Sequence, residues 1–451
     1  MSLAELRERA FQASLQVKEL KEQVLMRRAQ LIDSDVASFA QQNDFSTTQL
    51  QPHDFVCCRT LQGHTGKVYA LDWSQERDRI VSASQDGHLI VWNPLTSQKT
   101  HAIKLASSWV ITCAFSSDGV AVASGGLDSI CSVYVLNTQQ EQPISDPKTL
   151  HGHKGYISCC KFVPKRDAQI LTSSGDGTCA LWEVESCQKV SVFGGDSSCG
   201  HSADVVSLSV NTKEPHIFVS GSCDRTAKLW DMRTASRATQ TFQGHGGDVN
   251  TVQFLPDGLC FGTGSDDSTC KIFDTRTGHQ LQQYKDSHLS SEGAKVNSIA
   301  FSISGRFLLA AYSNADSDCY IWDTLTAEKV GNLKDSPNPH TMPVSCIGLA
   351  SDGSAVCTAS WDRTLKVWAS NERETQGVQH DGLRVTITLP LAYKPVYYKK
   401  FSLQAGTIKA IDKETTLHAI WTHLRGTSSN GQAFRQVASY RNRATGTAGN
   451  I

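Results

Sequence analysis

One short pattern returns seven times along this 451-residue chain. Each copy is an apolar run that ends in an aromatic residue, in most copies followed by Asp or a polar substitute. The aromatics are spaced 42, 48, 48, 43, 49 and 46 residues apart, at Trp92, Tyr134, Trp182, Trp230, Phe273, Trp322 and Trp368. A repeat of this length cannot bury its apolar face alone, so neighbouring copies must stack and bury it between them. The chain is therefore expected to form one ordered array of similar units.

Each repeat reads as short β-strands joined by Gly, Asp and Ser turns. In the first copy, the runs 68–73 and 79–84 lead into the turn Gln85-Asp86-Gly87. A 40–50-residue period with Gly-His and Trp-Asp punctuation is typical of WD40 blades. We therefore predict an all-β, seven-bladed WD40 propeller over residues 54–369. The strand at 54–61 should complete the last blade beside residues 344–369, because a shared blade closes the ring. Such a ring favours a binding surface over an active site.

Bulk composition narrows the function. Residues 371–451 hold 11 Lys/Arg and 5 Asp/Glu, so they carry +6 and residues 1–370 carry −7 of a total of −1. A mildly acidic propeller argues against nucleic-acid binding. The fifteen cysteines lack zinc spacing, which favours buried free thiols over disulfides or a metal site. With no signal peptide, spanning segment or lipidation motif, the chain is expected to be soluble and to reach membranes only through partners. No cofactor is predicted.

Polar residues recur at fixed places inside the repeats. In the first copy the His of Gly-His, Ser82 or Ser84, the turn Asp and the final Trp can join by hydrogen bonds. A His–Asp pair beside Ser resembles a hydrolase triad, but catalysis needs one site, whereas every blade must satisfy its buried polar atoms. A structural network is therefore expected, with no catalytic residue. Its predicted members are His64, Asp86, Trp92, His153, Asp176, Trp182, His201, Asp224 and Trp230.

Residues 1–35 read as a helix with a seven-residue apolar seam. No Gly or Pro interrupts residues 3–31, and Glu, Lys and Arg fill much of the remainder. So narrow a stripe suits a two-stranded coiled coil, with an ordinary amphipathic surface helix as the alternative. The sequence holds no second heptad segment, so the partner helix must come from another chain. The seam residues are Leu3, Leu6, Ala10, Ala13, Val17, Leu20, Val24 and Leu31.

The flanking segments are less informative. Residues 36–53 read as a polar linker, and residues 370–451 form an atypical basic extension that does not continue the repeat. Its end, 426–451, has the composition of a partly disordered segment. Lys394, Lys399 and Lys400 lie among aromatics, a pattern that suits a small hydrophobic hairpin better than contact with nucleic acid or anionic lipid.

A heptad helix followed by this ring resembles the β subunit of heterotrimeric G proteins. The resemblance covers about residues 3–369, and the stretch 192–195 is most similar to plant-type members. The segments that carry it are 63–70 (GHTGKVYA), 81–87 (VSASQDG), 107–110 (SSWV), 125–128 (GGLD), 155–160 (GYISCC), 263–267 (TGSDD) and 359–362 (ASWD).

This resemblance implies a non-catalytic subunit that forms an obligate dimer with a G-protein γ subunit. The dimer would bind the GDP-loaded α subunit on the narrow propeller face and relay receptor signals to effectors. The implied location is the cytoplasm and the cytoplasmic face of the plasma membrane, through lipidated partners. The implied α-contacting residues are Lys67, Tyr69, Ile90, Lys99, Ser108, Trp109, Leu127, Ser129, Tyr156, Asp204, Val206, Asp248, Asp266 and Trp361.

Several positions depart from the family pattern. Ser129 and Val206 stand where Asn and Met are usual. The second blade has Ser107-Ser108 in place of Gly-His, and the last blade has 338–340 (NPH). Trp109 could alternatively be a blade-core tryptophan.

Two other functions are alternatives to this one. Another WD40 scaffold, such as a kinase-anchoring ring or a ubiquitin-ligase substrate receptor, would usually lack the heptad helix and the rim sequence. An enzyme is disfavoured because the chain has no Gly-x4-Gly-Lys-Ser/Thr phosphate loop and no unique carboxylate or Cys/His pair.

Overall fold

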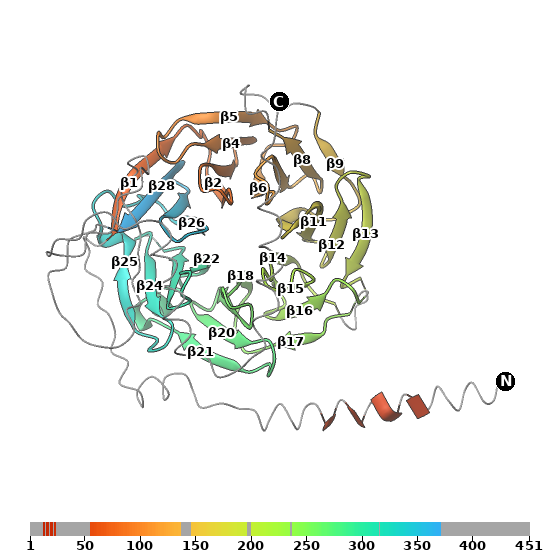
Figure 1. Cartoon of the computed structure of the whole chain (residues 1–451). Helices are drawn as coiled ribbons and strands as arrows, with labels where there is room; N and C mark the ends of the chain where they lie inside the picture. The colour runs from red at the N-terminus through yellow and green to blue at the C-terminus, as the bar shows by residue number, and fades with distance from the viewer. Residues whose placement is uncertain are drawn as a thin grey trace, which may run out of the picture. The chain divides into compact units, whose positions relative to one another are not determined.

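A computed structural model describes residues 55–136, 146–195, 200–234, 237–314 and 316–370, with residues 12, 13, 15–17, 19, 20, 22 and 23 near the start of the chain. The described residues form seven four-stranded antiparallel sheets. The sheets stand around one axis, with the first strand of each innermost (Figure 1). This arrangement confirms the predicted all-β, seven-bladed propeller.

The strands follow chain order outwards from the axis in the first six blades. Blades 1 to 3 are β2 (Val68–Trp73), β3 (Ile80–Ser84), β4 (His88–Trp92) and β5 (Lys99–Lys104); β6 (Val110–Phe115), β7 (Ala121–Gly126), β8 (Cys131–Val135) and β9 (Lys148–Leu150); and β10 (Ile157–Val163), β11 (Arg166–Ser174), β12 (Cys179–Glu183) and β13 (Gln188–Phe193).

Blades 4 to 6 are β14 (Val205–Val210), β15 (Ile217–Ser222), β16 (Ala227–Asp231) and β17 (Gln240–Phe242); β18 (Val249–Phe254), β19 (Cys260–Ser265), β20 (Cys270–Asp274) and β21 (Gln280–Tyr284); and β22 (Val296–Phe301), β23 (Phe307–Tyr312), β24 (Cys319–Asp323) and β25 (Lys329–Asn332). Blade 7 is β26 (Val344–Leu349), β27 (Val356–Ser360), β28 (Thr364–Ser370) and β1 (Phe55–Gln62).

The core lies between neighbouring blades. The second strands β3 and β23 are buried along their whole length, whereas the outer strand β13 is mostly exposed. One cluster joins Leu61 and Leu365 of blade 7 to Val68, Ile80 and Trp92 of blade 1. Burying apolar area between sheets in this way makes each blade depend on its neighbours, as in other repeat architectures.

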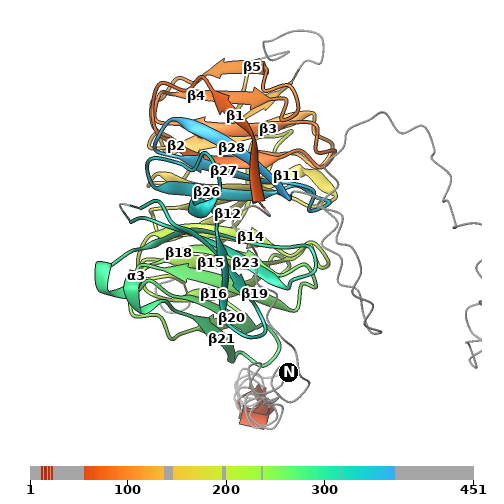
Figure 2. The same cartoon turned by 90° about the vertical axis from the view of Figure 1, so that its left-hand side faces the viewer.

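Strand β1 closes the ring. It pairs antiparallel with β28 from Phe55 opposite Ser370 to Gln62 opposite Thr364, with one irregularity between Cys57 and Arg59. The two strands lie side by side in Figure 2. The expectation that the start of the ring completes its last blade is confirmed.

Two short helical segments interrupt the blades. Helix α3 (Ser287–Glu292) follows β21, and the 3₁₀ turn η1 (Leu333–Asp335) follows β25. The Asp286 carboxylate accepts a hydrogen bond from the amide of His288 at the start of α3, and Gly293 ends the helix with φ of +66°. Leu289 of α3 is fully buried, so the helix inserts an apolar side chain between blades 5 and 6.

The N-terminal segment is described only in part. All of its described residues are helical, and Val17 and Leu20 of the predicted seam are more than half exposed, as is Leu15. Ala13 is exposed as well. The other seam residues, the predicted linker at 36–53 and the predicted extension beyond residue 370 lie outside the described residues, so the coiled coil and these boundaries stay predictions.

Candidate protein-docking face

One end of six of the seven blades is built by the same backbone contact. The residue just before the inner strand offers its carbonyl, and the residue just after the second strand donates its amide to it. The pairs, donor first, are Gln85 and Lys67 at 2.9 Å, Gly175 and Tyr156 at 3.0 Å, Cys223 and Asp204 at 3.0 Å, Asp266 and Asp248 at 2.9 Å, Ser313 and Lys295 at 2.8 Å, and Trp361 and Pro343 at 3.1 Å. Trp109 and Leu127 occupy the corresponding places in blade 2. We call the surface made by these seven pairs the rim face.

Most of the predicted α-contacting residues fall on the rim face. Five of them precede inner strands, namely Lys67, Trp109, Tyr156, Asp204 and Asp248. Three follow second strands, namely Leu127, Asp266 and Trp361. Residues far apart in the sequence thus share one end of the ring, as their spacing after Gly-His indicated.

Aromatic side chains gather where blades 7, 1 and 2 meet on the rim face. The Lys67 ammonium nitrogen lies 3.9 Å from the centroid of the Trp361 ring, a cation–π contact. The rings of Tyr69 and Trp109 stack with centroids 6.3 Å apart. Trp109 is 43% exposed, so it is not a blade-core tryptophan. Leu127 beside it is also exposed.

Carboxylates gather on blades 4 and 5 of the same face. Tyr156 donates its hydroxyl hydrogen to Asp204 across 3.0 Å, and Lys295 forms an ion pair with Asp266. Burial, with the nearby charges of Asp248, Asp204 and Asp266, raises the pKa of the Cys223 thiol to about 12. The rim face therefore has an aromatic sector with Lys67 and, further round the ring, an acidic sector.

The remaining predicted contact residues are placed less uniformly. Lys99 on β5 and Ser108 are exposed, whereas Ser129 and Val206 are half-buried. Lys99 donates to the carbonyl oxygen of Gly63 at 3.3 Å. Ile90 departs from the set, because its side chain is 3% exposed and packs in the cluster between blades 7 and 1. We correct the interpretation of Ile90 from a contact residue to a core residue.

The predicted polar networks form inside blades 1, 3 and 4. In blade 1, His64 Nδ1 lies 3.0 Å from the Asp86 carboxylate and His64 Nε2 lies 2.7 Å from Ser82 Oγ. Trp92 donates its indole N–H to the same Ser82 oxygen at 2.8 Å. Blade 3 repeats this geometry with His153, Asp176, Thr172 and Trp182, and blade 4 with His201, Asp224, Ser220 and Trp230.

Charge and tautomer follow from these contacts. The carboxylate accepts a hydrogen bond from Nδ1–H, so Nε2 carries no proton and accepts from the Ser or Thr hydroxyl. Burial opposes ionisation of Asp86, but hydrogen bonds from His64 and from the amides of Thr65 and His88 hold its pKa well below the usual range. Burial lowers the pKa of His201, which favours the neutral imidazole. Because such groups recur around the ring and hold one another, they are structural.

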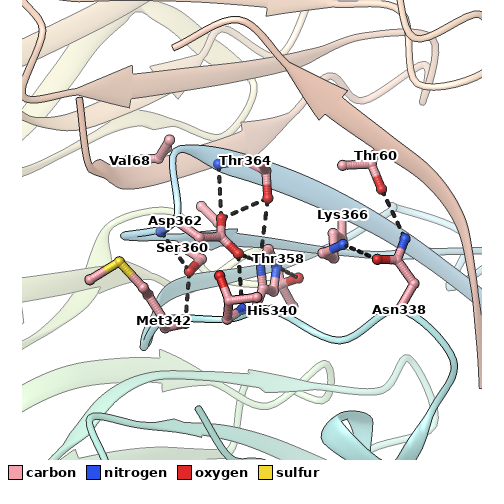
Figure 3. A network of polar contacts seen from close by, with 12 residues as sticks. Thr60, Val68, Asn338, His340, Met342, Thr358, Ser360, Asp362, Thr364 and Lys366 are labelled. Carbon is pink, nitrogen blue, oxygen red and sulfur yellow. Dashed lines mark hydrogen bonds and ion pairs between the residues drawn. The ribbon is translucent and has the colours of Figure 1, made fainter. Parts of the chain in front are cut away.

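The sequence did not predict two further networks of this kind. In blade 7, His340 lies 2.7 Å from Asp362 and 2.8 Å from Thr358 (Figure 3). The Thr358 oxygen also accepts from the indole N–H of Trp368. Blade 5 has the same His–Asp–Thr contacts at His245, Asp267 and Thr263, with Phe273 in place of Trp. Each His precedes its Asp by 22 or 23 residues, and this spacing would have found both networks.

Among the described residues, no group of three or more His, Cys, Asp or Glu side chains is placed to hold a metal ion. The described cysteines are free thiols, and half of them are buried. The rim face presents aromatic side chains, among them the exposed Trp109, and paired charges.

Comparison with known proteins now decides the family. The model of the family described as G protein beta WD-40 repeat protein matches residues 6–369. The chain belongs to the G protein β family.

Its relatives in this family include plant proteins named guanine nucleotide-binding protein subunit beta. Those of Nicotiana tabacum and Arabidopsis thaliana are each 56% identical over 371 residues, covering 82% of this chain and 98% of the relative. The protein of Oryza sativa subsp. japonica is 55% identical over 372 residues, covering 82% of this chain and 97% of the relative. The plant-type resemblance is thereby confirmed.

Membership in the G protein β family defines what kind of protein this chain is. This G protein β chain is a WD40 protein of signal transduction and is non-catalytic, so its His–Asp pairs serve the fold. Within the part of the chain that the structure describes, no helix has the length and apolar character needed to span a membrane.

Proposed function

We propose that this G protein β chain pairs with a γ subunit and docks a GDP-loaded α subunit on the rim face. Release of the α subunit on nucleotide exchange would free the rim face for effectors. The family match and the placement of the resembling residues on one face support this proposal.

The exposure of Trp109 is the main observation in favour of this proposal. An indole that is 43% exposed on a rigid ring, stacked on Tyr69, is costly to leave in water and suits the centre of a protein interface. On the same face, the Lys67 ammonium group lies over the ring of Trp361. Aromatic anchors bordered by charges are the composition of protein–protein hot spots.

The acidic sector would fix the orientation in which a partner docks. Asp204, Asp248 and Asp266 lie on adjacent blades, and Lys295 neutralises only one of them directly. A partner with basic residues on one side of its contact surface would be steered into a single register by this asymmetry. We therefore propose that the α subunit places an apolar segment on Trp109 and basic side chains on blades 4 and 5.

The γ subunit is proposed to cover the N-terminal helix. Val17 and Leu20 are 51% and 59% exposed, and both belong to the predicted seam. A single helix with such a stripe is marginal in water, and a second helix would bury it. In this proposal the lipidated partners hold the complex at the cytoplasmic face of the plasma membrane.

The test is reconstitution. The full chain, co-expressed with a plant-type γ subunit, is passed over immobilised α subunit loaded with GDP, and in parallel over α subunit loaded with a non-hydrolysable GTP analogue. Retention on the GDP form and loss on the GTP form are expected. A well-folded chain that binds neither γ nor GDP-loaded α would overturn the proposal, and capture of a ribosome or a ubiquitin ligase instead would favour the other scaffolds.

A further inference from the structure

Blade 2 contains a pocket where other blades contain an imidazole. Counting from Trp109 and from the end of β5, Leu105 and Ala106 occupy the places that Gly63 and His64 hold in blade 1. The Ser107-Ser108 pair is therefore not the substitute for Gly-His, and that interpretation is corrected. Blade 2 therefore has the methyl group of Ala106 where blade 1 has the imidazole of His64.

The groups that would bind this ring are still present. Ser124 pairs with Ser132 on β8 as Ser82 pairs with Ile90 on β4, so Ser124 takes the place of the network hydroxyl. Asp128 accepts from the amide of Ile130, as Asp86 does from His88. Tyr134 stands in the place of Trp92. These residues line a hollow of about 490 Å³, which also includes Ala106 and Trp109 and is open to solvent.

Two polar side chains of this pocket make fewer hydrogen bonds than their counterparts in blade 1. Ser124 is 2% exposed, yet its hydroxyl has no hydrogen-bond partner among the described residues, whereas Ser82 contacts both His64 and Trp92. Asp128 accepts only the Ile130 amide at 3.3 Å within the described part, whereas Asp86 also binds His64 and Thr65. The Ser124 hydroxyl and the Asp128 carboxylate can therefore each take a further hydrogen-bond partner through this hollow, which is open to solvent.

Blade 6 also lacks the imidazole, but its other residues at these places differ from those of blade 2. There Ala310 replaces the hydroxyl residue, and the fully buried Leu289 of α3 packs with it in an apolar cluster. Blade 6 has thus lost the imidazole and its hydroxyl partner, and the indole N–H of Trp322 is left without a hydrogen-bond partner among the described residues. Blade 2 has lost the imidazole and has Tyr134 in place of Trp92, but it keeps the Ser124 hydroxyl and the Asp128 carboxylate at the places that bind the imidazole in blade 1.

We propose that the blade 2 pocket binds an imidazole ring, supplied as the side chain of a histidine on a partner polypeptide. The ring N–H would donate to the Asp128 carboxylate, and the other ring nitrogen would accept from the Ser124 hydroxyl, which reproduces the contacts of His64. The polypeptide source follows from the position of the opening, since the exposed Trp109 forms part of the pocket wall and of the rim face. The site does not depend on which partner docks on the rim face.

The test uses the full-length chain and ligand-observed proton NMR at a pH of about 8, where most of the ring is neutral. Imidazole and N-acetylhistidine N-methylamide are titrated separately. Both are expected to bind saturably, with affinity in the millimolar range that suits so small a ligand. With 1-methylimidazole, which cannot donate and accept at once, binding is expected to be about tenfold weaker, the effect of losing one hydrogen bond to a charged group.

Two substitutions at one position provide the controls. Ala106→His supplies the ring from the chain itself, and Ala106→Leu fills the space with an apolar side chain. Both should abolish ligand binding, and circular dichroism checks that each variant is folded. Ser124→Ala leaves the space open and should weaken binding about tenfold, which covers the case in which a filled variant fails to fold.

Three results would overturn the proposal. Equal binding to the original chain and to a folded Ala106 variant would show non-specific association. Absence of saturable imidazole binding would show that the pocket does not recognise the ring. Binding of free imidazole without binding of the histidine derivative would exclude a partner histidine as its occupant.

Discussion

The ammonium group of Lys67 lies over the ring of Trp361, 3.9 Å from its centroid, and so connects the first blade to the last on the rim face. Lys67 precedes β2, and Trp361 follows β27 almost three hundred residues later. The contact exists because blade 7 packs against blade 1 where the ring closes, so the candidate docking face and the closure of the fold are physically linked.

Replacing the exposed indole should weaken docking without harming the fold. We expect Trp109→Ala to reduce affinity for GDP-loaded α subunit by about 1–3 kcal/mol, because truncation removes an aromatic anchor. Titration calorimetry measures the loss. The matched control is Val120→Ala, since Val120 is 48% exposed at the opposite end of the same blade. Equal losses for both variants, or unfolding of Trp109→Ala, would contradict the assignment of Trp109.

The closing strand should control the stability of the whole ring. Leu61 is fully buried between blades 7 and 1, so Leu61→Ala is expected to lower the free energy of unfolding by about 2–5 kcal/mol. Removal of residues 54–61 should abolish cooperative unfolding, because β28 becomes an unpaired edge. Urea denaturation followed by circular dichroism measures both effects. The neighbouring exposed Gln62→Ala should change stability by less than about 0.5 kcal/mol.

The sequence predicted those features that repeat. Ring closure follows from an apolar strand before the first Gly-His, and the networks at His64, His153 and His201 follow from recurring residue types. His340 was overlooked because Pro339 replaces the usual Gly, although its distance to Asp362 is the same 22 residues as from His64 to Asp86. Repetition is visible in a sequence because each blade meets the same local physical requirement.

Features that depend on contact between blades could not be predicted. The burial of Ile90 arises from packing against Leu61 and Cys357, which come from opposite ends of the ring sequence. The blade 2 pocket could not be predicted either. Ala106 alone does not say whether a neighbouring side chain fills the vacated space. Such answers depend on side chains that meet only after the ring has closed.

The acid sensitivity of the ring should depend on its network carboxylates. Burial opposes ionisation, but the hydrogen bond and charge of His340 lower the pKa of Asp362 to about 2. A carboxyl whose pKa is about 4 when unfolded and lower when folded stabilises the fold above pH 4, and that stabilisation is lost as pH falls towards 2. We therefore expect Asp362→Asn to cost about 1–3 kcal/mol at pH 7 and less at pH 3.

Urea unfolding at the two pH values measures this difference. The exposed Glu76→Gln serves as the control and should leave both values within about 0.5 kcal/mol. An Asp362→Asn penalty that is equal at pH 7 and pH 3 would show that ionisation of this carboxyl does not stabilise the ring.

The N-terminal helix offers a matched comparison within a few residues. Val17 and Leu20 lie on the predicted seam, whereas Leu15 is equally exposed but lies off it. Val17→Asp combined with Leu20→Asp should abolish pairing with the γ subunit, because a dimer would bury both charges without partners. Leu15→Asp should leave pairing intact. Co-purification with tagged γ subunit measures the outcome for each variant. Equal loss of pairing in the two variants would favour a broad amphipathic surface helix over a coiled-coil seam, because only a narrow seam distinguishes these positions.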